Sequence, residues 1–188
     1  MMSLEEVVAL VSAKLEECGI SYMIVGSFAS NIYGIARSTH DADMVVEIDG
    51  PGIEKLGQAL GEEFYFDIEG AKESLKLGVM FNAVHYPSGL KLDLIAIKNR
   101  PFDHEEFRRK KLTNFAGSKC WFATAEDTIL AKLEWSKMGE SERQFNDAVN
   151  IAKVQGAKLD FTYLQRWAAD LQIENLLNQL LEEIKPAA

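Results

Sequence analysis

The sequence predicts an α+β protein, with strands and helices in the first part of the chain and helices alone after it. Three observations lead to this class. Short apolar strands can be recognised before residue 124. Amphipathic helices are interspersed among them. After Thr124, every apolar stripe repeats at helical spacing. We therefore expect an α/β core over residues 1–123 and a helical region over residues 124–188.

Length and composition fit a globular protein. The 188 residues are enough for one domain, or for a small domain with a helical appendage, and 47% of them are hydrophobic. The longest apolar runs are too short to cross a bilayer, and the amino terminus lacks a signal-type stretch, so we expect a cytoplasmic protein. The formal net charge of −9 disfavours broad binding to nucleic acid, because the average field repels polyanions.

The first predicted element is an amphipathic helix. Ser3 and Glu6 have the spacing of a capping box, and Gly19 is a natural helix end. The next predicted elements follow in chain order: strand 21–26, helix 27–34, strand 41–48, and a helix from Pro51 whose apolar stripe reaches Phe64.

A β-hairpin is predicted next. Residues 79–86 and 90–97 read as strands around a turn at Pro87, Ser88 and Gly89. The stretch 102–110 is expected to be helical, and 119–123 is expected to be a short strand.

The region after residue 123 is predicted to be all helix. Thr124 and Asp127 are expected to cap a helix that carries an apolar stripe. That stripe and the later ones are Ile129, Leu130, Leu133 and Trp135; Phe145, Ala148, Val149 and Ala152; Leu164, Trp167, Ala168 and Leu171; and Leu176, Leu177, Leu180, Leu181 and Ile184.

Acidic residues mark two of the predicted strands. Asp41 and Asp43 share one face of strand 41–48, because successive side chains of a strand point to opposite faces. Two carboxylates a pleat apart repel each other, so they need a solvated surface or a cation between them. Asp93 begins the polar face of strand 90–97. Three carboxylates could hold a pair of divalent cations, whereas each alone is compatible with ordinary solvated surface.

A strand-to-helix turn at Gly26 and Ser27 is the second candidate feature. Its backbone N–H groups and hydroxyl suit a triphosphate, although the same pair could simply cap a helix. Arg37 could neutralise phosphate charge with its planar fork of donors.

The stretch "VGSFASNIYGIARSTHDADMVVEI" resembles the DNA polymerase β-like nucleotidyltransferases, in which an apolar strand and Gly-Gly or Gly-Ser precede Asp-x-Asp in a second strand. The spacing is most similar to that of AbiEii-like and related uncharacterised bacterial nucleotidyltransferases. In their pattern, the matching positions are Gly34, Arg37, Thr39, Asp41 and Asp43. The later stretches "AEDTILAKLEW" and "ERQFNDAVNI" resemble the helical half of the same branch.

This resemblance implies a mixed sheet with flanking helices and a helical region that helps to enclose a nucleotide. It implies that Ser27 contacts phosphate, and that Asp41 and Asp43 hold two Mg²⁺ ions. Asp93 would join the metal ligands and help to activate an acceptor hydroxyl. Lys132 and Arg143 would reach the nucleotide, with surface charge as their alternative role.

The expected function is transfer of a nucleoside monophosphate from an NTP to a hydroxyl, with release of pyrophosphate. The acceptor could be a tRNA 3′ end, a protein or a small molecule. The alternative is a non-catalytic nucleotide-binding module, or a toxin–antitoxin regulatory module that acts with a partner protein; a homodimer is also compatible with the sequence. Arg108, Arg109, Lys110 and Lys111 form a basic cluster that could face phosphate or simply end a solvated helix.

Overall fold

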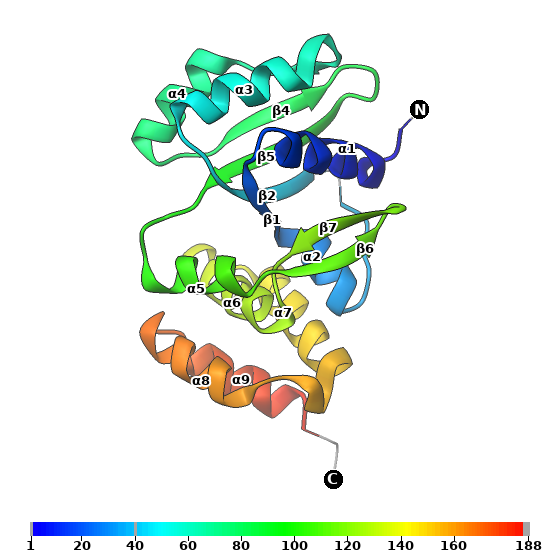
Figure 1. Cartoon of the computed structure of the whole chain (residues 1–188). Helices are drawn as coiled ribbons and strands as arrows, with labels where there is room; N and C mark the ends of the chain where they lie inside the picture. Colours follow the sequence, from blue (N-terminus) through cyan, green and yellow to red (C-terminus); the bar gives the residue numbers. More distant parts are fainter. Residues whose placement is uncertain (1, 40, 186–188) are drawn as a thin grey trace. The chain divides into compact units, whose positions relative to one another are not determined.

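The structure, a computed structural model, describes residues 2–39 and 41–185 (Figure 1). It is an α+β fold with a seven-stranded mixed sheet, flanking helices and carboxy-terminal helices, which confirms the predicted class. The chain forms two compact units. One comprises residues 1–25 and 39–123, and the other comprises residues 26–38 and 124–188. The segment 26–38 thus groups with the later helices, although it lies in the first part of the sequence.

The first unit contains the whole sheet, with the strand order β3-β4-β5-β2-β1-β7-β6. The pairs β2–β5 and β1–β7 are parallel, and the other neighbours are antiparallel. The strands are β1 (Ser21–Ile24), β2 (Asp41–Glu47), β3 (Phe64–Tyr65), β4 (Phe81–His85), β5 (Leu90–Ala96), β6 (Lys111–Phe115) and β7 (Ser118–Phe122).

The first unit also contains four α-helices within its described residues: α1 (Leu4–Glu17), α3 (Gly50–Leu60), α4 (Ile68–Leu77) and α5 (Pro101–Arg109). The predicted capping box is confirmed at the start of α1. Ser3 Oγ accepts a hydrogen bond from the Glu6 N–H at 3.2 Å, and the Ser3 N–H donates to Glu6 Oε2 at 2.7 Å. Helices α3 and α4 lie side by side (Figure 1).

Three elements of the first unit differ from the local expectations. Helix α3 stops at Leu60, because Gly61 adopts a φ of +61°, and Phe64 belongs to β3 instead of the helix. Helix α4 was not predicted, because its periodic signal is short: Ile68, Ala71 and Leu75 follow helical spacing, but only Ala71 is buried. Strand β6 also escaped prediction, because none of its residues is fully buried and it lacks the apolar alternation of a core strand.

The two faces of the sheet are covered differently. On one face, Met44 and Leu94 are fully buried on strands that α1 contacts. On the other face, Val45 and Ile97 pack against a buried cluster that includes Phe107 of α5. Because Val45 shares its face with the residues two and four positions earlier, this second face is the one that carries the aspartates.

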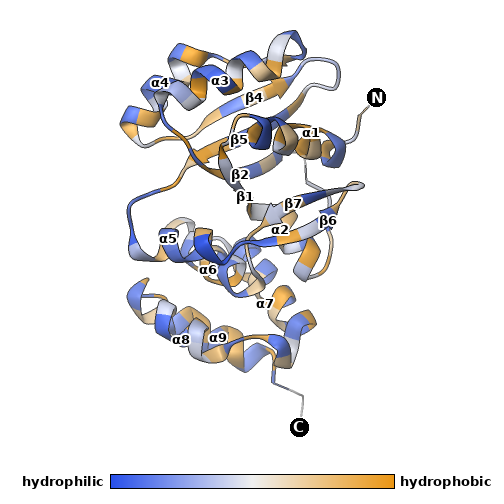
Figure 2. Ribbon diagram, in the orientation of Figure 1, coloured by the Kyte–Doolittle hydropathy of each residue, from blue (hydrophilic) through white to orange (hydrophobic). Residues whose placement is uncertain are grey.

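The second unit is helical. Its elements are α2 (Gly26–Tyr33), α6 (Ala125–Gly139), α7 (Glu142–Gln155), the short 3₁₀ helix η2 (Gly156–Lys158), α8 (Phe161–Asp170) and α9 (Glu174–Glu183). Thr124 caps α6 as predicted, with its Oγ1 accepting from the Asp127 N–H at 3.2 Å. Hydrophilic and hydrophobic residues alternate along α8 and α9, as expected for amphipathic helices (Figure 2). Trp135, which was expected on the buried stripe of α6, is instead 57% exposed.

A membrane-spanning helix would need a long apolar stretch. Throughout residues 2–39 and 41–185, no helix has the length and apolar character to cross a bilayer.

Candidate functional site

The parallel pairing of β2 with β5 sets acidic residues side by side in the first unit. In this register Asp43 lies opposite Asp93, and Asp41 lies opposite Lys91. Directly opposite residues point to the same side of a sheet, and so do residues two apart on one strand. The structure therefore places Asp41, Asp43 and Asp93 on one face, together with Lys91.

Asp93 is the most enclosed of these aspartates. It is only 4% exposed, and its Oδ2 forms an ion pair with Lys91 Nζ at 2.9 Å. The hydrogen bond with Asp93 is the main reason that the pKa of Lys91 is raised, and the charges of Asp41 and Asp43 add to the effect. The second oxygen, Asp93 Oδ1, is buried and has no hydrogen-bond partner within the part of the chain that the structure describes. A buried carboxylate oxygen without a partner is costly, so this atom is suited to receive a donor or a cation.

Asp41 lies at the exposed start of β2. Thr39 Oγ1 donates to the Asp41 backbone oxygen at 3.0 Å and approaches Asp41 Oδ1 at 3.2 Å. Among the described residues, no three histidine, cysteine, aspartate or glutamate side chains are gathered closely enough to hold a metal ion. The carboxylates share a face, but in this conformation Asp93 is paired with Lys91.

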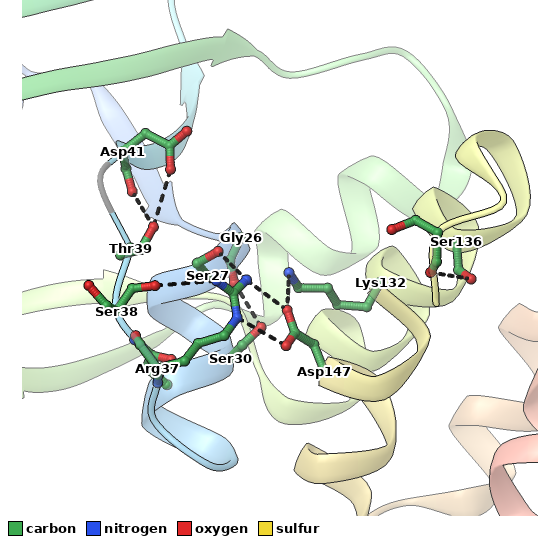
Figure 3. A network of polar contacts seen from close by, with 12 residues as sticks. Gly26, Ser27, Ser30, Arg37, Ser38, Thr39, Asp41, Lys132, Ser136 and Asp147 are labelled. Carbon is green, nitrogen blue, oxygen red and sulfur yellow. Dashed lines mark hydrogen bonds and ion pairs between the residues drawn. The ribbon is translucent and has the colours of Figure 1, made fainter. Parts of the chain in front are cut away.

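The second unit contains a compact charged cluster, formed by Arg37, Asp147 and Lys132 with Ser27 (Figure 3). Arg37 donates two hydrogen bonds to the Asp147 carboxylate, from Nε to Oδ1 at 3.1 Å and from Nη2 to Oδ2 at 3.0 Å. Lys132 Nζ reaches Asp147 Oδ2 at 3.0 Å. Arg37 Nη2 also donates to Ser27 Oγ at 2.9 Å. Two cations thus converge on one anion beside the Ser27 hydroxyl.

The electrostatics of this cluster follow from its burial. Asp147 is 8% exposed and Lys132 is 5% exposed. Burial by itself would raise the pKa of Asp147, but the hydrogen bonds and the positive charges of Arg37 and Lys132 together outweigh burial and lower the pKa below its usual value of 3.8. With all three groups ionised, the Asp147 carboxylate lies between two cations, each within hydrogen-bond distance.

Local backbone geometry positions the two ends of the cluster. Gly26 adopts a φ of +63°, which glycine tolerates better than other residues, at the point where α2 begins. The Asn31 side chain then holds the backbone of Arg37, since Nδ2 donates to the Arg37 oxygen at 2.8 Å and Oδ1 accepts from the Arg37 N–H at 3.0 Å. A Cβ on Gly34 would lie 3.1 Å from the Ile151 backbone nitrogen, so glycine lets this connection approach α7 closely.

The predicted nucleotide-binding residues therefore differ in their surroundings. Ser27, Arg37 and Lys132 are brought together, whereas Arg143 is exposed on α7 outside the contacts of the cluster described above. Asp147 is the residue that the site prediction missed. A signal was present, because Asp147 interrupts a helical stripe of buried residues at 145, 148 and 149. The three aspartates belong to the other unit, and their proximity to this cluster stays a prediction.

The basic cluster 108–111 is partly occupied by contacts within the protein. Arg108 forms an ion pair with Glu105, Nη2 to Oε1 at 2.8 Å. Lys110 Nζ bonds to Ser21 Oγ and lies 3.6 Å from the centroid of the Phe107 ring. Burial also lowers the pKa of Lys110. At least two of the four basic side chains thus have structural partners, which weakens the case for a phosphate-facing patch.

A cavity of about 630 Å³ lies among α6, α7 and α9 of the second unit. None of the predicted nucleotide-binding residues lines it. Its charged lining residues are Lys137, Glu140, Glu142 and Glu183.

Comparison with known proteins identifies the fold. No family model and no curated protein matches the sequence. Among solved structures, an antigenic nucleotidyltransferase-like protein from Paracoccidioides brasiliensis is similar over 97% of this chain and 94% of its own, with 19% identity and a TM-score of 0.58. ANT(2″)-Ia in complex with adenylyl-2″-tobramycin is similar over 93% of this chain and 99% of its own, with 12% identity and a TM-score of 0.56.

A third solved structure, JHP933 from Helicobacter pylori, is similar over 98% of this chain and 80% of its own. Its sequence identity is 16% and its TM-score is 0.50. At these low sequence identities, the similarity shows a shared fold and nothing further. The chain has the fold of nucleotidyltransferase-like proteins.

Proposed function

We propose that this protein is a Mg²⁺-dependent nucleotidyltransferase that moves a nucleoside monophosphate from an NTP to a hydroxyl acceptor. The observation that carries the proposal is the register of β2 and β5. It places Asp43 beside Asp93, on the face that also carries Asp41, in a fold found in nucleotidyltransferase-like structures. Carboxylates from adjacent strands are the kind of ligand set that divalent-ion phosphate chemistry uses.

The charged cluster of the second unit supports the same assignment. Arg37 and Lys132 supply two cations, and Ser27 supplies a hydroxyl beside them. Asp147 holds both cations in place. We assign binding of the triphosphate to this cluster, with Gly26 providing the turn that exposes the start of α2. Arg143, exposed on α7, is assigned a contact with the nucleotide from outside the cluster.

The reaction requires one bond to form and one to break. The acceptor oxygen attacks the α-phosphorus, and the bond from that phosphorus to the bridging oxygen breaks, so that pyrophosphate leaves. The hydroxyl proton must go to a base, and Asp93 is the residue assigned to accept it. A carboxylate has two oxygens, so one oxygen of Asp93 can take the proton while the other is a metal ligand.

The residues of the first unit fit a divalent cation in their chemistry. Asp41, Asp43 and Asp93 offer hard oxygen ligands, and Asp93 Oδ1 is a buried oxygen without a hydrogen-bond partner among the described residues. We assign these three side chains as ligands of two Mg²⁺ ions. When bound, Mg²⁺ would supply positive charge to the phosphate oxygens.

The acceptor class is inferred from charge. The net charge of −9 disfavours a polyanionic acceptor, and the basic cluster at 108–111 is partly engaged within the protein. A neutral or cationic small molecule with a hydroxyl group is therefore the favoured acceptor, as in the solved complex that contains adenylyl-2″-tobramycin. A tRNA 3′ end and a protein hydroxyl are the competing acceptors.

The test is pyrophosphate release from each of the four NTPs with Mg²⁺, in separate reactions with an aminoglycoside mixture, total tRNA and a protein extract. We expect release to depend on one acceptor class and to fall by at least about a hundredfold in Asp43→Asn, because an electrostatic contact to the reacting groups is lost. The matched control is Asp170→Asn, which changes an exposed aspartate of α8. Equal release by the wild type and Asp43→Asn would rule out the assigned site.

A second candidate is a nucleotide-binding protein without catalysis, which could act as a regulatory module with a partner protein. It is favoured by the pairing of Asp93 with Lys91 and by the lack of a gathered metal-ligand set among the described residues. Calorimetry with a non-hydrolysable NTP measures nucleotide binding, and the pyrophosphate assay with ordinary NTPs then separates a binding module from an enzyme. Saturable Mg²⁺-NTP binding without pyrophosphate release under any acceptor condition would favour the binding module.

A further inference from the structure

Lys91 is a cation placed among three carboxylates. The β2–β5 register pairs Asp41 with Lys91 and Asp43 with Asp93, so the four side chains form two adjacent rows on one face. Lys91 is the only basic member of this group. Its ammonium therefore offsets part of a repulsion that the three aspartates would otherwise exert on one another.

The ion pair with Lys91 involves only one of the two carboxylate oxygens of Asp93. Lys91 Nζ lies 2.9 Å from Asp93 Oδ2, and the Asp93 side chain is only 6% exposed. Asp93 Oδ1, by contrast, is buried with no hydrogen-bond partner within residues 2–39 and 41–185. A divalent cation attracts carboxylate oxygens more strongly than a single ammonium does, because it carries twice the charge and binds several oxygens.

Lys91 is also placed where it can break its ion pair with Asp93. Its side chain is 42% exposed, in contrast to the enclosed carboxylate that it contacts. A flexible four-carbon stem lets an ammonium at this exposure turn into solvent, where it is strongly hydrated. The ion pair thus joins an enclosed carboxylate, that of Asp93, to an ammonium group that can move into solvent, that of Lys91.

We propose that Lys91 is a displaceable counterion of the metal site. It neutralises the carboxylate face when no divalent cation is bound, and it gives up Asp93 when the cation arrives. This inference rests on the proposed function, since it assumes that Asp41, Asp43 and Asp93 take a divalent ion. It makes a distinct statement, namely that lysine and metal compete for the same carboxylate.

The test is a titration of the full chain with Mn²⁺, in which free Mn²⁺ is followed by electron paramagnetic resonance. Lys91→Met removes the charge and keeps the length of the side chain, and we expect it to bind Mn²⁺ about fivefold more tightly than the wild type. Lys91→Arg keeps the charge and should stay within about twofold of the wild type. Lys119→Met makes the same change at an exposed residue of β7, which β1 separates from β2, and should leave the affinity unchanged.

A stability measurement guards against a folding artefact. We expect Lys91→Met to unfold at a lower temperature than the wild type without metal, because its carboxylates repel each other, and to gain more from added Mn²⁺. If Lys91→Met does not fold, Lys91→Gln takes its place in both measurements.

Equal or weaker Mn²⁺ binding by the neutral variant would overturn the inference, and so would the absence of Mn²⁺ binding in both proteins. Pyrophosphate release separates this result from the proposed function. A wild type that releases pyrophosphate while the variants bind Mn²⁺ equally would sink only the Lys91 inference. A wild type without release, whose neutral variant binds Mn²⁺ more tightly, would sink only the transferase.

Discussion

Arg37 and Asp147 are 110 residues apart in the sequence and are joined by two hydrogen bonds, Nε to Oδ1 at 3.1 Å and Nη2 to Oδ2 at 3.0 Å. This paired geometry uses the planar fork of the guanidinium, which a lysine lacks. Asp147 also accepts from Lys132, so one carboxylate orients both cations. The first predictions concern this cluster.

Replacing Asp147 with asparagine should destabilise the protein by about 3 kcal/mol, because the buried Lys132 loses its ion pair with Asp147. Urea-induced unfolding at neutral pH measures the change. Asp170→Asn, the same substitution at an exposed position on α8, should change stability by less than about 0.5 kcal/mol. Equal effects of the two substitutions would show that the Asp147 ion pairs contribute nothing to folding.

Acid should remove the Asp147 contribution. The pKa of Asp147 is lower in the folded protein than its usual 3.8, so the unfolded chain takes up the proton first as the pH falls. The stabilisation is complete above that usual value and is lost as the pH drops through the folded pKa. We expect the stability difference between the wild type and Asp147→Asn to be constant from about pH 7 to about pH 5 and to shrink near pH 3. A difference that grows on acidification would contradict the assigned charge state.

Arg37→Lys should weaken nucleotide binding. Lysine keeps the positive charge but cannot bridge both Asp147 oxygens and Ser27 at once. We expect about tenfold weaker binding of a non-hydrolysable Mg²⁺-NTP by calorimetry, as for the loss of a charge-assisted hydrogen bond. Arg166→Lys on α8 is the matched control and should bind as the wild type does. Unchanged affinity in Arg37→Lys would remove Arg37 from the proposed triphosphate site.

Gly34→Ala should destabilise the second unit by about 1 to 3 kcal/mol, because the new methyl group would lie 3.1 Å from the Ile151 nitrogen and from the Ser30 oxygen. Backbone atoms on both sides leave little room for relaxation. Gly139→Ala, at the end of α6, meets nothing within 4 Å and should be neutral or stabilising. Thermal unfolding of both variants measures the contrast, and a neutral Gly34→Ala would show that the close approach to α7 is not required.

Thr124→Ala should cost about 1 kcal/mol, since the Asp127 N–H loses its acceptor at the start of α6. Thr124→Ser keeps the hydroxyl and should retain most of the stability. Urea-induced unfolding of the pair isolates the cap, and equal losses in both variants would point to the threonine methyl group instead.

The elements that could be predicted from sequence are those with local causes. Ser3 with Glu6 and Thr124 with Asp127 mark helix starts, because each cap joins residues three apart. The alternation of strand 41–48 assigns Asp41 and Asp43 to one face without any knowledge of the neighbouring strand. Helix α4 was missed because its local signal is short, with Ile68, Ala71 and Leu75 at helical spacing and only Ala71 buried.

The sequence by itself determined the α+β class, the caps of the helices at Ser3 and Thr124, and the shared face of the first two aspartates. Only the tertiary structure decided that β2 pairs with β5 in the register that sets Asp43 opposite Asp93 and brings Lys91 among the carboxylates. It alone joined Arg37 to Asp147 across 110 residues. The physical reason is that capping and strand alternation depend on neighbours in the chain, whereas strand register and buried ion pairs depend on how distant segments pack.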